Sequence, residues 1–180
     1  MSIQQTVGFI GAGNIAEAMI RGIITSGALD PGQIAISDLN EARLLHLHRT
    51  LGATITASNE ENAARSRILF LAVKPAQVVE VARGVSGAVG PDHSVVSVAA
   101  GTSLARIRAA LGPEPRLFRI MPNLATSVRR SAIGLFAERG NGANGEPGPV
   151  HELLGCLGKV FRIEDEAQMA AVTALSGSAP

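Results

Sequence analysis

An apolar run that turns abruptly into glycine most constrains how this chain can fold. Residues 7–10 are Val-Gly-Phe-Ile, and Gly11-Ala12-Gly13 follows them directly. Apolar residues then recur at positions 15, 18, 19 and 23, the spacing of an amphipathic helix. The pattern Gly11-x-Gly13-x-x-Ala16 therefore lies between a predicted strand and a predicted helix, the setting of a dinucleotide-binding turn. The alternative interpretation is an ordinary strand–helix turn.

Each small residue of this pattern has a physical purpose in a dinucleotide-binding turn. Gly11 permits the tight turn, and Gly13 lets the backbone approach a pyrophosphate where a Cβ would collide. Ala16 is small enough for the helix to lie close to the strand. The free N–H groups at the start of the helix then face the anion.

Strand-like and helix-like stretches alternate along the rest of the chain. The run at 68–73 is apolar throughout, which is typical of a strand buried on both faces of a parallel sheet. Strands are expected at 7–10, 34–37, 53–56, 68–73, 94–98, 117–120, 132–136 and 159–163. This alternation predicts an α/β fold with a Rossmann-like, doubly wound and mostly parallel sheet.

Several local signals predict where the helices begin. Pro75 suits the first position of a helix, and residues 139–149 have the composition of a flexible surface loop. Helix-capping side chains are expected at Asp38 or Asn40, at Asn59, at Thr102 or Ser103, and at Asp165.

Composition narrows the classes of partner. The chain has 180 residues, enough for one sizeable core, with 16 Lys and Arg against 15 Asp and Glu and no Trp or Tyr. Near-neutral charge and few aromatic residues predict no nucleic-acid partner. No apolar run is long enough for a membrane helix, no signal peptide is evident, and a single cysteine suits the cytoplasm. The four histidines do not cluster, so no metal site is expected.

The residues after the second predicted strand bear on the choice of cofactor. Doubly wound sheets bind ligands beyond the carboxyl ends of their strands. Asp38 could accept hydrogen bonds from the adenosine ribose hydroxyls, which favours NAD, or it could simply cap a helix. Ser37 and Asn40 could instead donate to a 2′-phosphate, and Arg43 is one turn away. The sequence leaves the choice between NAD and NADP open.

Four further positions follow predicted strands. Asn59 could donate to the adenosine moiety or cap a helix. Lys74 would oppose the dipole of the following helix unless an anion shares the site, and the alternative is a solvated lysine. Ala100 lies in a run of small residues over which a flat ring could slide. Asn123 offers a donor and an acceptor to a carboxamide or ribose, or is a turn residue after proline.

Taken together, five motifs resemble the pyrroline-5-carboxylate reductases in order and spacing, over the whole chain. They are Gly8-Phe9-Ile10-Gly11-Ala12-Gly13-Asn14-Ile15-Ala16-Glu17-Ala18, Ala72-Val73-Lys74-Pro75, Val98-Ala99-Ala100-Gly101, Met121-Pro122-Asn123 and Thr173-Ala174-Leu175-Ser176-Gly177-Ser178. The resemblance implies that NADP or NAD, in its reduced form, delivers hydride to the C=N carbon of 1-pyrroline-5-carboxylate and gives L-proline.

The resemblance also implies which residues bind the cofactor. They are Ile10, Gly11, Ala12, Gly13, Asn14, Ile15, Ser37, Asp38, Asn59, Ala72, Val73, Lys74, Pro75, Ala100, Met121, Pro122 and Asn123. The catalytic residues stay unassigned, because in this chemistry the cofactor supplies the hydride and the protein supplies orientation.

Two departures from the family concern the end of the chain. The family has a second, helical domain that makes a homo-oligomer and much of the substrate pocket, including a Ser-Pro-Gly-Gly-Thr motif. Residues 1–164 would be the dinucleotide-binding domain and residues 165–180 the truncated start of that helical domain. Ala179 stands where the family usually has glycine. Without the helical domain, Met169, Ala170, Val172 and Leu175 are expected to form an exposed apolar patch that favours association.

Two alternative functions remain at this point. One is a non-catalytic NAD(P)-binding module, motivated by the missing substrate half. The other is an oxidoreductase similar to the β-hydroxyacid dehydrogenases. Those enzymes share the glycine turn, but this hypothesis does not predict Met121-Pro122-Asn123 together with Ser176-Gly177-Ser178.

Overall fold

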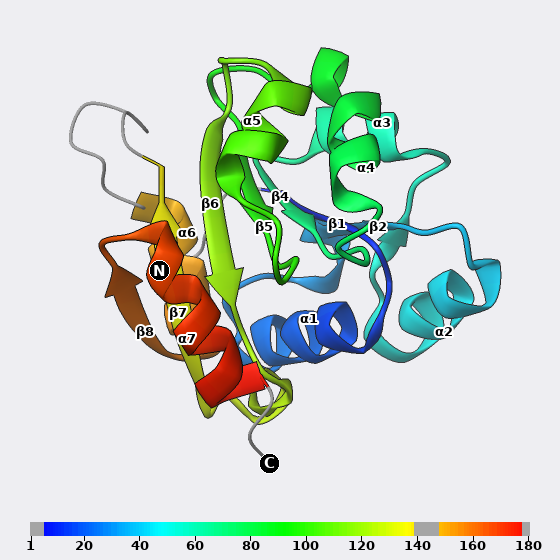
Figure 1. Ribbon diagram of the computed structural model, residues 1–180. Coiled ribbons are helices and arrows are strands. Elements are labelled where there is room, and N and C mark those ends of the chain that lie inside the picture. The colour runs from blue at the N-terminus through cyan, green and yellow to red at the C-terminus, as the bar shows by residue number, and fades with distance from the viewer. Residues whose placement is uncertain (1–5, 139–147, 178–180) are drawn as a thin grey trace.

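A computed structural model describes residues 6–138 and 148–177, which contain an eight-stranded sheet (Figure 1). Across the sheet the strand order is β3-β2-β1-β4-β5-β6-β7-β8. The strands are β1 (Val7–Ile10), β2 (Ile34–Ser37), β3 (Thr54–Ile55), β4 (Ile68–Leu71), β5 (Ser94–Ser97), β6 (Arg116–Met121), β7 (Ser131–Ala137) and β8 (Gly158–Ile163). All neighbouring pairs are parallel except β6 and β7. The predicted doubly wound, mostly parallel sheet is confirmed.

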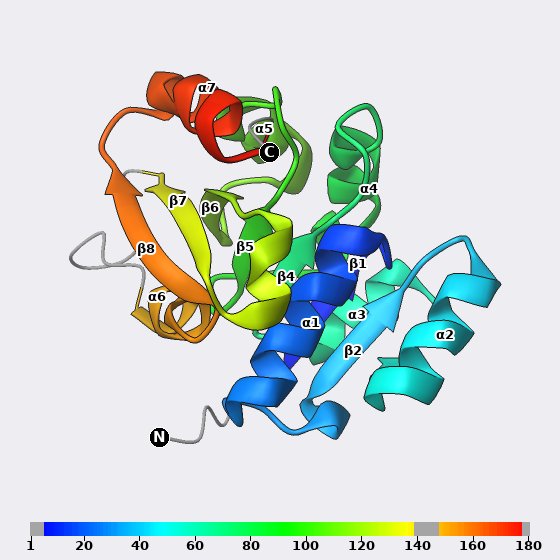
Figure 2. The same cartoon turned by 90° about the horizontal axis from the view of Figure 1, so that it is seen from below.

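Helices cover both faces of the sheet. The α-helices are α1 (Asn14–Ser26), α2 (Glu41–Leu51), α3 (Asn59–Arg65), α4 (Val78–Gly84), α5 (Leu104–Leu111), α6 (Gly148–Gly155) and α7 (Met169–Val172). Short helical turns are η1 (Pro31–Gln33), η2 (Ser86–Ala88), η3 (Leu124–Val128), η4 (Glu166–Gln168) and the π-type turn η5 (Thr173–Gly177). Side chains of α1, α2 and α6 share one buried cluster, and those of α3, α4 and α5 share the other. The two layers are visible in Figure 1, and Figure 2 shows α1 in front of the sheet.

The centre of the sheet is built from fully buried apolar strands. All four residues of β1 and all four of β4 are buried. The two strands are parallel and place Phe9 beside Phe70, whose rings stack with centroids 4.7 Å apart. Strands that are apolar on both faces are stable only where helices cover both faces of the sheet. Strands β1 and β4 therefore lie between the two helical layers.

The short turn η4 is held against the sheet by the residues at its start. Asp165 caps η4 as predicted, by accepting from the backbone N–H of Ala167. Glu166 accepts from Arg119 on β6 at 3.0 Å and from the backbone N–H of Leu104 at 2.8 Å. One carboxylate oxygen therefore joins η4, β6 and the start of α5.

The expected apolar patch on the last helix is only partly present. Leu175 is 78% exposed, but Met169 is fully buried, so the prediction of an exposed Met169 is wrong. The reason is that α7 packs against β7, where Gly134 has no side chain and leaves room for Val172.

Several predicted helix starts also need correction. Asn40 caps α2, whereas Ser58, not Asn59, caps α3. Helix α4 begins at Val78, so Pro75 lies in the preceding turn. Neither Thr102 nor Ser103 gives α5 a side-chain cap, because Glu166 takes that place from a distant part of the chain.

The predicted loop at 139–149 falls largely outside the described residues, and α6 already begins at Gly148. Strand β3 is shorter than expected, with only Thr54 and Ile55 paired to β2. Across the described residues, none of the helices has the length and apolar character needed to cross a membrane.

Candidate functional site

A cavity of about 910 Å³ opens at the carboxyl ends of β1, β2 and β4. Strand β1 continues into α1 on one face, while β4 leads to α4 on the other, so this edge is the switch point of the sheet. Predicted residues that line the cavity are Ile10, Gly11, Gly13, Asp38, Asn59, Ala72, Val73 and Lys74.

Gly11 is required by the fold itself. Its φ is +101°, and a Cβ there would come within 2.5 Å of the carbonyl oxygen of Ala72. Its N–H donates to the Ser37 carbonyl at 2.8 Å, which ties the end of β1 to the end of β2. A side chain would therefore be strained both by conformation and by contact.

Gly13 differs, because nothing in the described structure demands a glycine. Its φ of −72° suits any residue, and a Cβ there would meet no atom within 4 Å. The position faces the cavity. The space next to this backbone is therefore open to a ligand, and no neighbouring side chain plugs the turn.

Helix α1 presents its N-terminus to the same space. Gly13 is the N-cap residue and has no side chain to satisfy the first N–H groups of Asn14–Ser26. The helix dipole adds partial positive charge at this end. Ala16 is fully buried, as expected for close packing of the helix on the strand. Ala12, Asn14 and Ile15 belong to this same turn.

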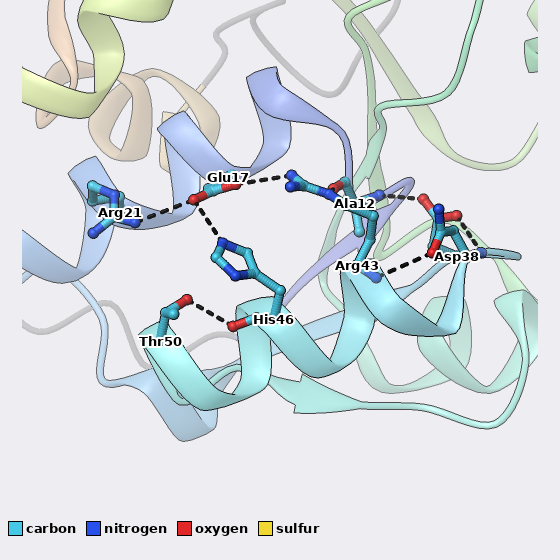
Figure 3. Close-up of polar contacts among 8 residues, drawn as sticks. Ala12, Glu17, Arg21, Asp38, Arg43, His46 and Thr50 are labelled. Carbon is cyan, nitrogen blue, oxygen red and sulfur yellow. Dashed lines mark hydrogen bonds and ion pairs between the residues drawn. The ribbon is translucent and has the colours of Figure 1, made fainter.

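Asp38 braces the glycine turn from the end of β2 (Figure 3). Its Oδ2 accepts from the backbone N–H of Ala12 at 2.6 Å, and its Oδ1 accepts from that of Asn40 at 2.8 Å. Asp38 thus stabilises the glycine turn. It is not the side-chain cap of α2, because Asn40 is that cap.

Beside the turn, Glu17 on α1 contacts the side chains of two arginines and one histidine (Figure 3). Arg43 donates to Glu17 at 2.8 Å and, through its Nε, to the carbonyl of Ala12 at 2.9 Å. Arg21 and His46 each lie 3.2 Å from the same carboxylate. Burial alone would raise the pKa of Glu17, but hydrogen bonds from His46, Arg43 and Arg21 together hold that pKa below its ordinary value.

Ser37 is predicted to lie near the adenosine ribose, but its side chain is turned inward. It is 3% exposed; its hydroxyl donates to Asn59 at 2.7 Å and accepts from the Asn62 amide at 3.0 Å. The Asn62 amide also donates to the Phe9 carbonyl. This chain of bonds fixes β1, β2 and α3 behind the cavity and leaves Asn59 at its rim.

The remaining predicted residues continue along the same sheet edge. Lys74 and Pro75 are exposed after β4, and Ala100 follows β5. Met121 and Pro122 are buried at the end of β6. None of Pro75, Ala100, Met121, Pro122 and Asn123 lines the 910 Å³ cavity, which ends at β4.

Asn123 uses its side-chain oxygen within the protein. The oxygen accepts from the backbone N–H of Ala125 and from the Ser131 hydroxyl, both at 3.1 Å. The polar groups that this side chain can offer to a ligand are therefore its amide N–H groups.

Besides the residues named above, sequence analysis identified Asn40 as a candidate, and it missed the rest of the cavity wall. The unpredicted lining residues are Leu39, Glu41, Glu60, Gln77, Glu80, Val81 and Gly84. Leu39 is 96% exposed, and an apolar residue directly after Asp38 in a polar turn was the available signal for it. Helix α4 and its N-cap residue Gln77 gave no such signal, because only the packing of that helix brings Gln77 and Val81 to the cavity. Within the described ranges, no three metal-ligating side chains come together.

Known proteins resemble this chain in both sequence and fold. Pyrroline-5-carboxylate reductases from Haemophilus influenzae and Methanosarcina acetivorans are 34% and 35% identical to it, over 97% and 98% of this chain. The match spans 63% and 64% of those relatives, so the chain covers less than two thirds of their length.

Solved structures give the same picture. A pyrroline-5-carboxylate reductase from Coxiella burnetii superposes with a TM-score of 0.90 at 30% identity, over 99% of this chain and 66% of that one. A Plasmodium falciparum pyrroline carboxylate reductase with NADP bound, at 20% identity, gives a TM-score of 0.87 over 98% of this chain and 64% of that one.

The family model described as NADP oxidoreductase, coenzyme F420-dependent, matches residues 6–101, more than half of the chain. The chain belongs to this NADP oxidoreductase family.

Proposed function

We propose that this chain takes part in the NAD(P)H-dependent reduction of 1-pyrroline-5-carboxylate to L-proline. The observation that carries the proposal is the glycine turn, where Gly13 faces an open cavity at the switch point. The relatives named pyrroline-5-carboxylate reductase match 97% or 98% of this chain and support the choice of reaction.

The residues at the cavity fit a nicotinamide dinucleotide. The uncapped N-terminus of α1 and the bare backbone at Gly13 suit the diphosphate, and the Asp38 carboxylate suits the adenosine ribose. Leu39 offers an exposed apolar surface to the adenine ring. When bound, the cofactor would supply the hydride for the C=N carbon.

The chain's own contribution at the nicotinamide end is orientation. Ala72 to Pro75 follow β4, Ala100 follows β5, and Met121 to Asn123 lie at the end of β6, so they continue the same sheet edge away from Asp38. The amide N–H groups of Asn123 can donate to a carboxamide or a ribose oxygen. No side chain is assigned as the proton donor to the imine nitrogen.

We also propose a division of the chain near residue 165. Residues 1–164 form the dinucleotide-binding part, and residues 165–180 begin a helical part that supports a homo-oligomer. The greater length of the relatives and the exposure of Leu175 favour this division. A net charge of +1 favours a small-molecule substrate over nucleic acid, and a cytoplasmic location fits the single cysteine.

A second candidate function is a dinucleotide-binding module without turnover. It is favoured by the 63% share of the relatives' length that the chain spans. An assay of the purified chain for NADH and NADPH oxidation with 1-pyrroline-5-carboxylate distinguishes the reductase from the binding module. The Haemophilus influenzae relative is the positive control. Turnover above the substrate-free rate supports the reductase. Cofactor binding by calorimetry without turnover supports the module, and failure to bind either cofactor contradicts both.

A further inference from the structure

We propose that the adenosine end of the cavity selects NADH, with a free ribose 2′-hydroxyl, over NADPH, with a 2′-phosphate. This inference rests on the proposed function and adds the preference that the sequence leaves open. Three carboxylates, those of Asp38, Glu41 and Glu60, line this end of the cavity. The guanidinium that could offset them is engaged elsewhere.

The three carboxylates share one end of the cavity because of the strand order. Asp38 and Glu41 follow β2, and Glu60 follows β3, which lies next to β2 in the sheet. Backbone hydrogen bonding at Glu60 itself and a bond from Ser58 lower the pKa of Glu60, so it is ionised at neutral pH. A 2′-phosphate would bring nearly two further negative charges into this group.

Asp38 cannot easily turn away from such a phosphate. Its two oxygens are held by the N–H groups of Ala12 and Asn40, at 2.6 and 2.8 Å. A carboxylate oxygen can accept more than one hydrogen bond, so Asp38 can still accept from ribose hydroxyls. The same fixed carboxylate thus favours a hydroxyl and repels a phosphate.

Two of the groups that could donate to a 2′-phosphate, the Ser37 hydroxyl and the Arg43 guanidinium, are committed within the protein. The Ser37 hydroxyl is buried and donates to Asn59. The Arg43 guanidinium donates to the Ala12 carbonyl and pairs with Glu17, which offsets its charge (Figure 3). Asn40 lines the cavity but is neutral, and its side-chain oxygen caps α2.

Among the described residues that line the cavity, Lys74 is the one lysine or arginine. It lies at the end of the cavity opposite the three carboxylates. It follows β4, and β1 lies between β4 and β2. Two strand spacings amount to about 10 Å, which separates Lys74 from the backbone at Asp38. This position suits the diphosphate side of the cavity better than the ribose 2′ position.

Calorimetric titration of the 180-residue chain with NADH and with NADPH tests the preference. The expected result is a Kd for NADH at least about tenfold lower, with the ratio shrinking as salt screens the carboxylates. Equal or tighter binding of NADPH overturns the preference and leaves the proposed function standing. Binding of neither overturns the proposed function, and the preference with it.

Charge-removing variants locate the source of the preference. Asp38→Asn keeps a side-chain oxygen for the Ala12 N–H, and the double change Glu41→Gln with Glu60→Gln alters only exposed groups. Each is expected to lower the ratio of the NADPH Kd to the NADH Kd by about threefold or more. Glu80→Gln is the matched control, because Glu80 lines the cavity from α4, beyond β4. An equal effect of Glu80→Gln, or unchanged ratios in both test variants, overturns the assignment to these carboxylates.

Discussion

At the residue scale, two glycines of one motif serve different needs. Gly11 has positive φ and lies against Ala72, whereas a Cβ at Gly13 would meet open space. The sequence predicts both, because the motif gives each a defined purpose. It could not predict that Asp38 holds the Ala12 N–H, a contact between residues 26 positions apart.

Replacing Gly11 should therefore damage the fold. Gly11→Ala forces a side chain into a left-handed conformation and against the Ala72 carbonyl. We expect it to lower the free energy of unfolding by about 2–4 kcal/mol, measured by urea denaturation. Gly32→Ala is the control, because a Cβ at Gly32 meets nothing within 4 Å. Equal stability of the two variants would contradict the assigned strain.

The Glu17 cluster makes a prediction about pH. Because the pKa of Glu17 is lowered in the folded state from its ordinary value of 4.5, its stabilisation is present above that value. This stabilisation is lost as pH falls through the folded-state pKa. Glu17→Gln should cost about 1 kcal/mol of unfolding free energy at pH 7 and progressively less as the pH is lowered below 4.5, measured by urea denaturation over this range. A cost that does not change with pH would refute the ionic role.

At the element scale, the strands were predictable and the helix ends less so. Apolar runs such as 68–73 show a buried strand by themselves, because both faces must be covered. The caps depend on what folds nearby: Glu166 reaches α5 from 62 residues away, which no local pattern reveals. The antiparallel turn from β6 to β7 likewise depends on η3, which packs against α1.

Removing Glu166 tests this long-range cap. Glu166→Ala would leave Arg119 as an unpaired buried cation, because its side chain is 7% exposed and its Nε has no hydrogen-bond partner among the described residues. We expect a loss of about 3 kcal/mol of unfolding free energy in urea denaturation. Asp165→Ala, which removes only the local cap of η4, should cost about 1 kcal/mol. Similar losses in both variants would argue against the joining role of Glu166.

At the scale of the whole molecule, the site follows from topology. The order β3-β2-β1-β4 places the glycine turn between the carboxylates after β2 and the lysine after β4. The sequence predicted this edge through the rule for doubly wound sheets. It missed the wall formed by α4, because that wall exists only once the helix packs.

Association is the prediction that belongs to this scale. Leu175 is 78% exposed on η5, so we expect the chain to self-associate in sedimentation velocity experiments at increasing concentration. Leu175→Ser should weaken association, whereas Leu45→Ser, on the remote helix α2, should not. A chain that stays monomeric at all concentrations would contradict the expectation.

The most direct measurement of the central claim is dinucleotide binding by Gly13→Ala. We expect this variant to be within about 1 kcal/mol of the parent chain in urea, because the new methyl group meets no protein atom and the only loss is the poorer N-cap of α1. Its affinity for NADH and NADPH in calorimetry should fall by about 100-fold or more, because the methyl group occupies the space of the diphosphate. Undiminished binding of both cofactors by a folded Gly13→Ala chain would contradict the account.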